Sequence, residues 1–292
     1  MPRPRAARKP HARQRSARTR RPRRRRRGIR LASLLPSPRT RQRVLRAFRR
    51  APAGLQVLLV LGLATLLLLG LNWVCQVVRK PSELFFPVSG TLDKTPAQTW
   101  HSYGPIFRKH STAVITPTFL AALAQVEGSG NPVARTYWRW RWTHRLLEIY
   151  RPASSAVGMY QITDGTFAEA RRYCIHNHVV VEDGPWHDWR SCWFNALYMR
   201  IVPSHAVEMT AAYLDRRVAI ILARQRLTGA TLAQKQRLAA AIHLCGAGAA
   251  ERFARRGLRP AGQRCGDHDL ALYLAKVDAL QAVFARLAAN VS

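Results

Sequence analysis

The chain has 292 residues and a formal net charge of +33 at pH 7, and this charge is concentrated at one end. Residues 1–50 hold 21 of the 48 basic residues and none of the 15 acidic ones, and they include an unbroken arginine run over 23–27. So charged a segment cannot bury a core, which excludes a globular fold for it. We therefore expect residues 1–53 to form a disordered basic tail.

An uncharged apolar stretch follows this tail. Residues 54–78 read GLQVLLVLGLATLLLLGLNWVCQVV, long enough for a helix to cross the hydrocarbon core of a bilayer. Trp73 lies near its end, where interfacial aromatic residues collect. Because the arginines precede the stretch, the positive-inside rule places the tail in the cytoplasm and residues 79–292 outside it. We expect an uncleaved single span, with a cleaved signal peptide as the alternative.

The arginine block has a second interpretation. Clustered arginines are also typical of nucleic-acid binding, which would make the protein a membrane-tethered nucleic-acid binder. The positive-inside rule already accounts for the block, so we do not expect nucleic acid as a partner.

Cysteine usage agrees with an exported domain. One cysteine lies in the apolar stretch and four lie beyond it, and an even number in an oxidising compartment predicts two disulfide bonds. Three pairings are possible; the local one closes two loops of about 20 residues. A C-x-H-x-H pattern at the first of these cysteines would suit zinc, but we favour a disulfide beside solvated histidines and expect no metal and no cofactor. The four cysteines are Cys174, Cys192, Cys245 and Cys265.

The remaining chain predicts one helical domain. Residues 79–115 are punctuated by proline and serine and are expected to be a linker and approach segment. Residues 116–289 alternate helical stretches with glycine and proline breaks, and they suffice for one domain. The class is therefore mostly α, because β-alternation is confined to residues 178–182. Helices are expected over 116–128, with Thr116 as N-cap and Gly128 as stop, and over 164–173, 205–228, 232–244 and 267–289.

Glu127 is the residue most suggestive of chemistry. It ends the apolar run TPTFLAALAQVE and is followed at once by GSGNP. A lone helical glutamate is ordinarily a solvated surface residue. Here the apolar neighbours, and the negative end of the helix dipole in the last turn, both favour the protonated carboxyl group. A protonated carboxylic acid is what a general acid needs in order to act on a glycosidic oxygen.

Four ordered segments carry a family resemblance. They are EGSGNP over 127–132, GMYQIT over 158–163, AAIHLCGAG over 240–248 and ALYL over 271–274. This series resembles the motifs E-S-x-x-N-P, G-x-M-Q-[IL]-x-P-x-T and A-A-Y-N-A-G-x-G, and the late aromatic residue, of the lytic transglycosylase family with a goose-lysozyme-like catalytic domain. The resemblance implies a lysozyme-like helical domain on the periplasmic side of a bacterial inner membrane. It also implies that the domain cleaves the MurNAc–GlcNAc bond of peptidoglycan strands and leaves a 1,6-anhydro product.

The resemblance also assigns roles. Glu127 becomes the catalytic acid and base, while Gln161 and Tyr273 belong to the substrate groove. A hydrolysing glycosidase generally needs two carboxyl groups, and the nearest candidates, Glu148 and Asp164, lie in no convincing motif. One acid/base suffices in the family, because the sugar's own 6-hydroxyl attacks C1 and no water is consumed.

Several positions depart from the family patterns. The serine after the glutamate is Gly128, with Ser129 adjacent, and the Tyr-Asn pair of the third motif is His243 and Leu244. We include Ser129, His243 and Tyr160 among the substrate-binding candidates. A histidine or tyrosine satisfied in the core is the structural alternative at the last two.

An insertion separates the first two motifs. Trp138, Trp140 and Trp142 alternate with Arg139 and Arg141. Aromatic faces stack on sugar rings and cations favour anionic polymers, so we expect Trp138 and Trp140 to contact the glycan. A flap packed on the domain, or a membrane-surface contact, is the alternative.

Two further functions stay open. The altered third motif suits a weakly active or inactive peptidoglycan-binding module within a conjugation or secretion apparatus. A hydrolytic lysozyme is the other alternative.

Overall fold

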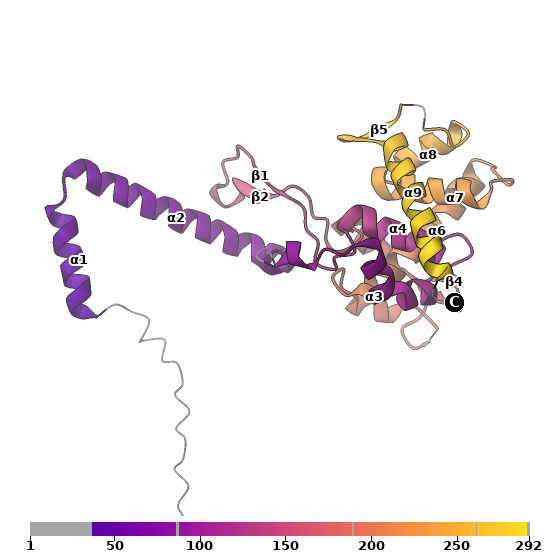
Figure 1. Ribbon diagram of the computed structural model, residues 1–292, viewed down its shortest axis with the longest axis horizontal. Helices are drawn as coiled ribbons and strands as arrows, with labels where there is room; N and C mark the ends of the chain where they lie inside the picture. Colours follow the sequence, from indigo (N-terminus) through magenta and orange to yellow (C-terminus); the bar gives the residue numbers. More distant parts are fainter. Residues whose placement is uncertain (1–36, 86–87, 189, 261, 291–292) are drawn as a thin grey trace, which may run out of the picture. The chain divides into compact units, whose positions relative to one another are not determined.

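A computed structural model describes residues 37–85, 88–188, 190–260 and 262–290. The chain divides into two units, residues 1–63 and 64–292. The described residues are mostly helical (Figure 1), which confirms the predicted class at this coarse level.

The first unit contains α1 (Pro38–Arg50) and the start of α2 (Ala53–Arg79). Helix α1 begins behind Ser37, whose hydroxyl accepts a hydrogen bond from the Thr40 amide at 3.2 Å. The prediction of a disordered tail is therefore wrong for residues 38–50. A serine cap followed by proline at the first helical position starts a helix, and arginine propagates one well. The remaining tail, residues 1–36, lies outside the described residues.

Helix α2 covers the predicted span with one extra residue at either end. Among the described residues it is the one helix long and apolar enough to cross a membrane. It continues into the second unit and is followed by two short 3₁₀ turns, η2 (Pro81–Phe85) and η3 (Ser89–Leu92).

Residues 79–115 are not a linker throughout. They contain α3 (Pro96–Lys109), in which Trp100 and Phe107 are buried in the core. Thr95 caps this helix in a reciprocal capping box with Gln98. That local signal outweighs the weak periodicity caused by Gly104 and Pro105 inside the helix. The folded domain therefore begins about twenty residues before Thr116.

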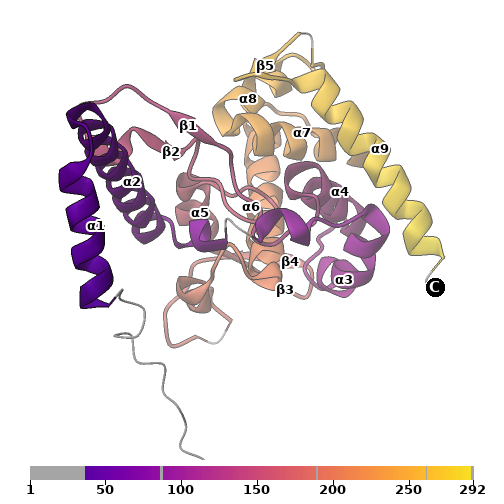
Figure 2. The same ribbon diagram turned by 60° about the vertical axis from the view of Figure 1, so that its left-hand side comes forward.

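Helix α6 (Pro203–Arg224) runs through the second unit (Figure 2). About half of its residues are buried. It packs against α3, α7, α8 and the short helix α5. Its buried side chains belong to the hydrophobic core of the unit. The predicted helix boundaries hold to within a few residues. The bounds are Asp164–Ala170 for α5 and Leu232–Cys245 for α7, whereas α8 (Ala247–Arg255) was not predicted.

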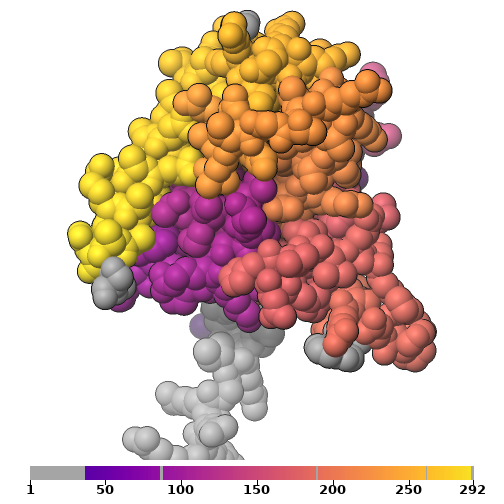
Figure 3. Space-filling model, turned by 90° about the vertical axis from the view of Figure 1, so that its right-hand side faces the viewer, coloured from indigo at the N-terminus to yellow at the C-terminus, as the bar shows by residue number. Residues whose placement is uncertain are grey.

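Helix α4 (Pro117–Gly128) lies between α3 and α9 (Leu270–Ala289). Its residues from Phe119 to Ala124 are completely buried. Figure 3 shows α9 in yellow along the purple α3 segment on one face of the molecule. Helices α4 and α9 pack together. Tyr273 near the start of α9 therefore meets Glu127 at the end of α4, although the two lie 146 residues apart in sequence.

Three two-stranded antiparallel hairpins complete the unit. The first pairs β1 (Trp138–Trp140) with β2 (Tyr150–Pro152). The second pairs β3 (Tyr173–His176) with β4 (Val179–Glu182), and only β4 was predicted. The third pairs β5 (Arg264–Cys265) with β6 (His268–Asp269), so α9 starts three residues later than predicted. The connecting 3₁₀ turns are η4 (Leu146–Glu148) and η5 (Trp193–Leu197).

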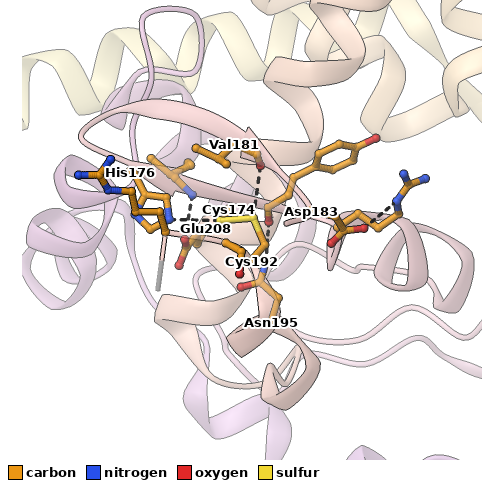
Figure 4. Close-up of a disulfide and its surroundings, with 12 residues drawn as sticks. Cys174, His176, Val181, Asp183, Cys192, Asn195 and Glu208 are labelled. Carbon is orange, nitrogen blue, oxygen red and sulfur yellow. Dashed lines mark hydrogen bonds and ion pairs between the residues drawn. A yellow bond between two sulfur atoms is a disulfide. The ribbon is translucent and has the colours of Figure 1, made fainter. Parts of the chain in front are cut away.

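The four exported cysteines form the local pairing. Cys174 joins Cys192 with their Cα atoms 5.4 Å apart, and Cys245 joins Cys265 at 5.2 Å. Figure 4 shows the first bond, which joins Cys174 of β3 to Cys192. The Asn195 side-chain amide donates to the Tyr173 carbonyl at 2.6 Å. Cys75 is the one free cysteine among the described residues.

Candidate active site

Glu127 stands in the last turn of α4. Thr116 caps the start of this helix, with Pro117 at the first helical position, and the apolar residues that follow fix the helix in the core. The carboxylate side chain is 17% exposed. The helix thus delivers a carboxyl group from the core to an accessible surface.

Gly128 lets the second motif approach this helix end. A Cβ added at Gly128 would lie 2.9 Å from the Met159 Cα atom and 3.1 Å from the Ala134 Cβ atom. Real Cβ contacts are not that short, so the serine of the family motif could not stand here without a shift. Absence of a side chain at Gly128 therefore brings residues 158–161 against the end of α4.

Gln161 also lies at this end of α4, and both its backbone and its side chain are restricted. Its backbone has φ +47°, an unusual conformation for a non-glycine residue. The side-chain Nε2 donates to the Ala134 carbonyl at 3.0 Å and to the Gly158 carbonyl at 2.9 Å. Both amide protons are therefore used within the protein, and the side-chain oxygen is the atom left to face a ligand.

Tyr273 and His243 meet Glu127 from two other helices. The Tyr273 hydroxyl on α9 donates to Glu127 Oε1 at 2.5 Å. His243 Nε2 on α7 lies 3.8 Å from the same oxygen, too far for a direct hydrogen bond, and its side chain is 10% exposed. Burial raises the pKa of Tyr273 well above its usual value, and the Glu127 carboxylate adds to this rise. Tyr273 therefore keeps its proton and remains a donor.

A cavity of about 640 Å³ opens beside Glu127. Gln161 and Tyr273 line it together with residues that sequence reasoning missed. Asp269 caps α9, its Oδ1 accepting from the Leu272 amide at 3.1 Å, and an acidic cap before a long helix was a readable signal. The missed lining residues with polar side chains are Arg135, Thr136, Tyr137, Asp267, His268, Asp269 and Lys276.

Three of the predicted substrate contacts, His243, Tyr160 and Ser129, do not line this cavity. His243 approaches Glu127 Oε1 but lines a separate small cavity. Tyr160 is fully buried and its hydroxyl donates to the Leu120 carbonyl at 3.1 Å, so it is a core residue and the substrate-binding prediction is wrong. Ser129 is the C-cap of α4, with φ +48°, and its carbonyl accepts from the Lys94 amide at 2.8 Å. It does not line the cavity.

The tryptophan hairpin also lies elsewhere. Trp138 Nε1 donates to Glu83 Oε2 at 2.8 Å, and its ring lies 5.1 Å from that of Tyr150. The Trp140 ring lies 4.7 Å from Tyr150 on the same hairpin. Neither tryptophan lines the cavity at Glu127, so their contact with a glycan stays a prediction. The hairpin instead packs on the end of α2.

The two carboxylates weighed for hydrolysis are also remote from Glu127. Glu148 pairs with Arg79 at 2.8 Å. Asp164 pairs with Arg200 at 2.8 Å and lines a different cavity. Across the described ranges, no group of three or more His, Cys, Asp or Glu side chains has the arrangement of a metal site.

Compared with protein-family models, with curated proteins and with solved structures, the chain gives no match. The family resemblance therefore rests on the four sequence motifs.

Proposed function

We propose that this chain is a membrane-anchored lytic transglycosylase that cleaves the MurNAc–GlcNAc bond of peptidoglycan. The observation that carries the proposal is the hydrogen bond from Tyr273 to Glu127 in the wall of a 640 Å³ cavity. The first and fourth motifs, far apart in the chain, supply these two side chains, and Gln161 from the second lines the same cavity. That the first and fourth motifs meet at one cavity supports the proposal.

The mechanism uses one carboxyl group twice. Protonated Glu127 donates its proton to the glycosidic oxygen while the bond from C1 to that oxygen breaks. The resulting carboxylate then takes the proton of the sugar's 6-hydroxyl, whose oxygen bonds to C1 and closes the 1,6-anhydro ring. Glu127 ends as it began, protonated, and no water is consumed.

The neighbours of Glu127 suit this cycle. Tyr273 and His243 both approach Oε1. In the described part of the chain no hydrogen bond is made to Oε2, which leaves that oxygen for proton exchange with the sugar. A hydrogen bond from Tyr273 stabilises the carboxylate that forms between the two steps.

The anchor and the disulfides support a periplasmic site. An uncleaved α2 would hold the helical second unit, which we take to be lysozyme-like, at the outer face of a bacterial inner membrane, with the N-terminus in the cytoplasm. Two disulfide bonds suit an oxidising compartment. Peptidoglycan strands would then be within reach as substrate.

The test is turnover of peptidoglycan sacculi by the full-length protein in detergent. We expect 1,6-anhydro-muropeptides from the wild type and none from Glu127→Gln. Glu251→Gln is the matched control, because Glu251 accepts a hydrogen bond from the Gln225 side chain away from the cavity and glutamine keeps an acceptor there. Wild-type activity in Glu127→Gln, or no anhydro product from any of the three proteins, would reject the proposal.

A hydrolytic lysozyme is the second candidate, and one observation favours it. Asp267 and Asp269 line the cavity beside Glu127, and paired carboxyl groups are the usual requirement for hydrolysis. Reducing ends in place of anhydro ends would identify this reaction. Binding of sacculi without turnover would instead identify a peptidoglycan-binding module, which the change to His243 and Leu244 in the third motif favours.

A further inference from the structure

One face of α2 changes from apolar to polar along its last three turns. Leu69 is followed by Trp73 and by the polar side chains of Asn72 and Gln76, and the helix ends at Arg79. Asn72 Nδ2 donates to the Tyr150 carbonyl at 2.6 Å and Gln76 Nε2 to the Leu147 carbonyl at 2.8 Å. Both side chains are buried. The hairpin of residues 138–152 is therefore fixed on α2 by buried hydrogen bonds.

The length of α2 places these turns at a membrane surface, provided that α2 spans the membrane as proposed above. Its 27 residues extend about 40 Å at 1.5 Å per residue, whereas the hydrocarbon core is about 30 Å thick. With the excess of about 10 Å placed at the end that carries Asn72, Gln76 and Arg79, the last two turns enter the headgroup layer. Trp73, Trp140 and Trp142 are all exposed, as interfacial aromatic side chains are.

A basic cavity of about 590 Å³ lies at this end of the helix. Three of its lining cations are paired: Arg79 with Glu148, Lys80 with Glu83, and Arg200 with Asp164. A fourth, Arg151, shares Glu148. The six lining cations are Arg79, Lys80, Arg139, Arg141, Arg151 and Arg200.

Positive charge remains after these pairs are counted. Within the described residues, no carboxylate lies at ion-pair distance from Arg139 or Arg141. Burial lowers the pKa of Lys80 despite its contact with Glu83, which means that its ammonium group is incompletely compensated. The cavity therefore favours an anionic ligand.

A second, apolar cavity of about 190 Å³ lies deeper along the same helix face. It is lined by Leu69, Asn72, Trp73, Trp138 and Tyr150. Asn72 Oδ1 is buried there without a hydrogen-bond partner among the described residues. The apolar cavity lies toward the membrane interior and the cationic cavity toward the membrane surface. A phospholipid places its acyl chain and its phosphate in the same order.

We propose that an anionic phospholipid occupies these two cavities. Its phosphate lies among Arg79, Arg139 and Arg141, and part of an acyl chain lies against Trp73 and Trp138. A zwitterionic lipid would add no net negative charge, so the unpaired arginines select the anionic one. The bound lipid holds the hairpin, and with it the second unit, at the membrane surface.

The test is lipid binding by full-length protein in detergent, measured by native mass spectrometry with phosphatidylglycerol or phosphatidylcholine. We expect the wild type to prefer phosphatidylglycerol and Arg139→Ala/Arg141→Ala to bind it on the order of 20-fold more weakly, because each arginine near a lipid surface contributes a few-fold. Neither substitution leaves a carboxylate unpaired. Arg255→Ala/Arg256→Ala removes the same charge from the exposed end of α8 and should leave binding unchanged.

Added inorganic phosphate separates the two sources of a phosphate group. If it displaces phosphatidylglycerol only weakly, the lipid assignment stands. Equal binding of the two lipids, equal losses in both arginine pairs, or phosphate binding without lipid preference would overturn it. Fractionation of cells separates this inference from the proposed function: a protein absent from the membrane fraction refutes the span, whereas a membrane protein without lipid preference refutes only the cavity assignment.

Discussion

The Tyr273 hydroxyl is the closest polar neighbour of Glu127 and donates to it at 2.5 Å. A hydrogen bond to a charged group contributes about 1.5–3 kcal/mol. We predict that Tyr273→Phe, which keeps the ring, lowers the rate of sacculus cleavage on the order of tenfold to a hundredfold. Tyr103→Phe, in α3 and outside the cavity, should retain wild-type rates. An unchanged rate in Tyr273→Phe would show that this tyrosine is only a packing residue.

Gly128 sets the distance between the first two motifs. We predict that Gly128→Ala lowers the free energy of unfolding by about 1–3 kcal/mol, because the new methyl group would press on the Met159 backbone. Thermal denaturation measures this. Gly165→Ala in α5 meets nothing within 4 Å and should leave stability unchanged or slightly raised. Equal changes in the free energy of unfolding for Gly128→Ala and Gly165→Ala would contradict the close approach of Met159 to Gly128.

The order of the motifs predicted which residues come together better than it predicted where each side chain points. Glu127, Gln161 and Tyr273 line one cavity, as the family patterns imply. Tyr160 stands between two motif residues yet faces the core. The left-handed backbone at Gln161 turns the chain at that point, and no composition or period in the sequence encodes such a reversal.

At the scale of elements, the Cys245–Cys265 bond joins the end of α7 to the hairpin that precedes α9. That hairpin supplies Asp267, His268 and Asp269 to the cavity wall. We predict that Cys245→Ser/Cys265→Ser lowers both thermal stability, by about 2–4 kcal/mol, and sacculus cleavage. Cys174→Ser/Cys192→Ser, away from the cavity, should cost similar stability with a smaller loss of activity at a temperature where both variants stay folded. Equal activity losses in the two double variants would contradict a specific role of the Cys245–Cys265 bond at the cavity.

Local signals predicted some elements and failed for others. Caps and apolar spacing gave α4, α6 and α7 to within a few residues. Helix α3 was missed because Gly104 and Pro105 interrupt its pattern, although T-P-A-Q at its start is a readable capping box. The orientation of Trp138 is set by tertiary contacts, with Glu83 and at the small cavity beside α2. The alternation of aromatic and basic residues does not encode these contacts, because it suits a glycan or a membrane surface equally.

For the whole molecule, we predict a loss of stability in mild acid. Burial lowers the pKa of His110, outweighing the Glu208 carboxylate 3.5 Å away. The unfolded chain, with a histidine pKa near 6.5, then binds the proton more readily than the folded one. Stability is therefore fully present above about pH 6.5 and falls as pH drops below it. Melting temperatures from pH 7.5 to pH 5 should decline less steeply for His110→Gln than for the wild type. Parallel curves would exclude His110 as the cause.

The apolar helix α2 was readable from sequence because a candidate membrane span is recognised by length and composition alone. The cavity at Glu127 was not, since it forms where α4, α7 and α9 meet. Such a meeting is set by core packing over the whole second unit, which local periodicity does not report.

Digestion of sacculi in ¹⁸O-labelled water tests the single-carboxylate mechanism most directly. Intramolecular attack by the 6-hydroxyl consumes no water, so we predict anhydro products without ¹⁸O. Incorporation of one ¹⁸O atom at each new reducing end would contradict this account and make the protein a hydrolase.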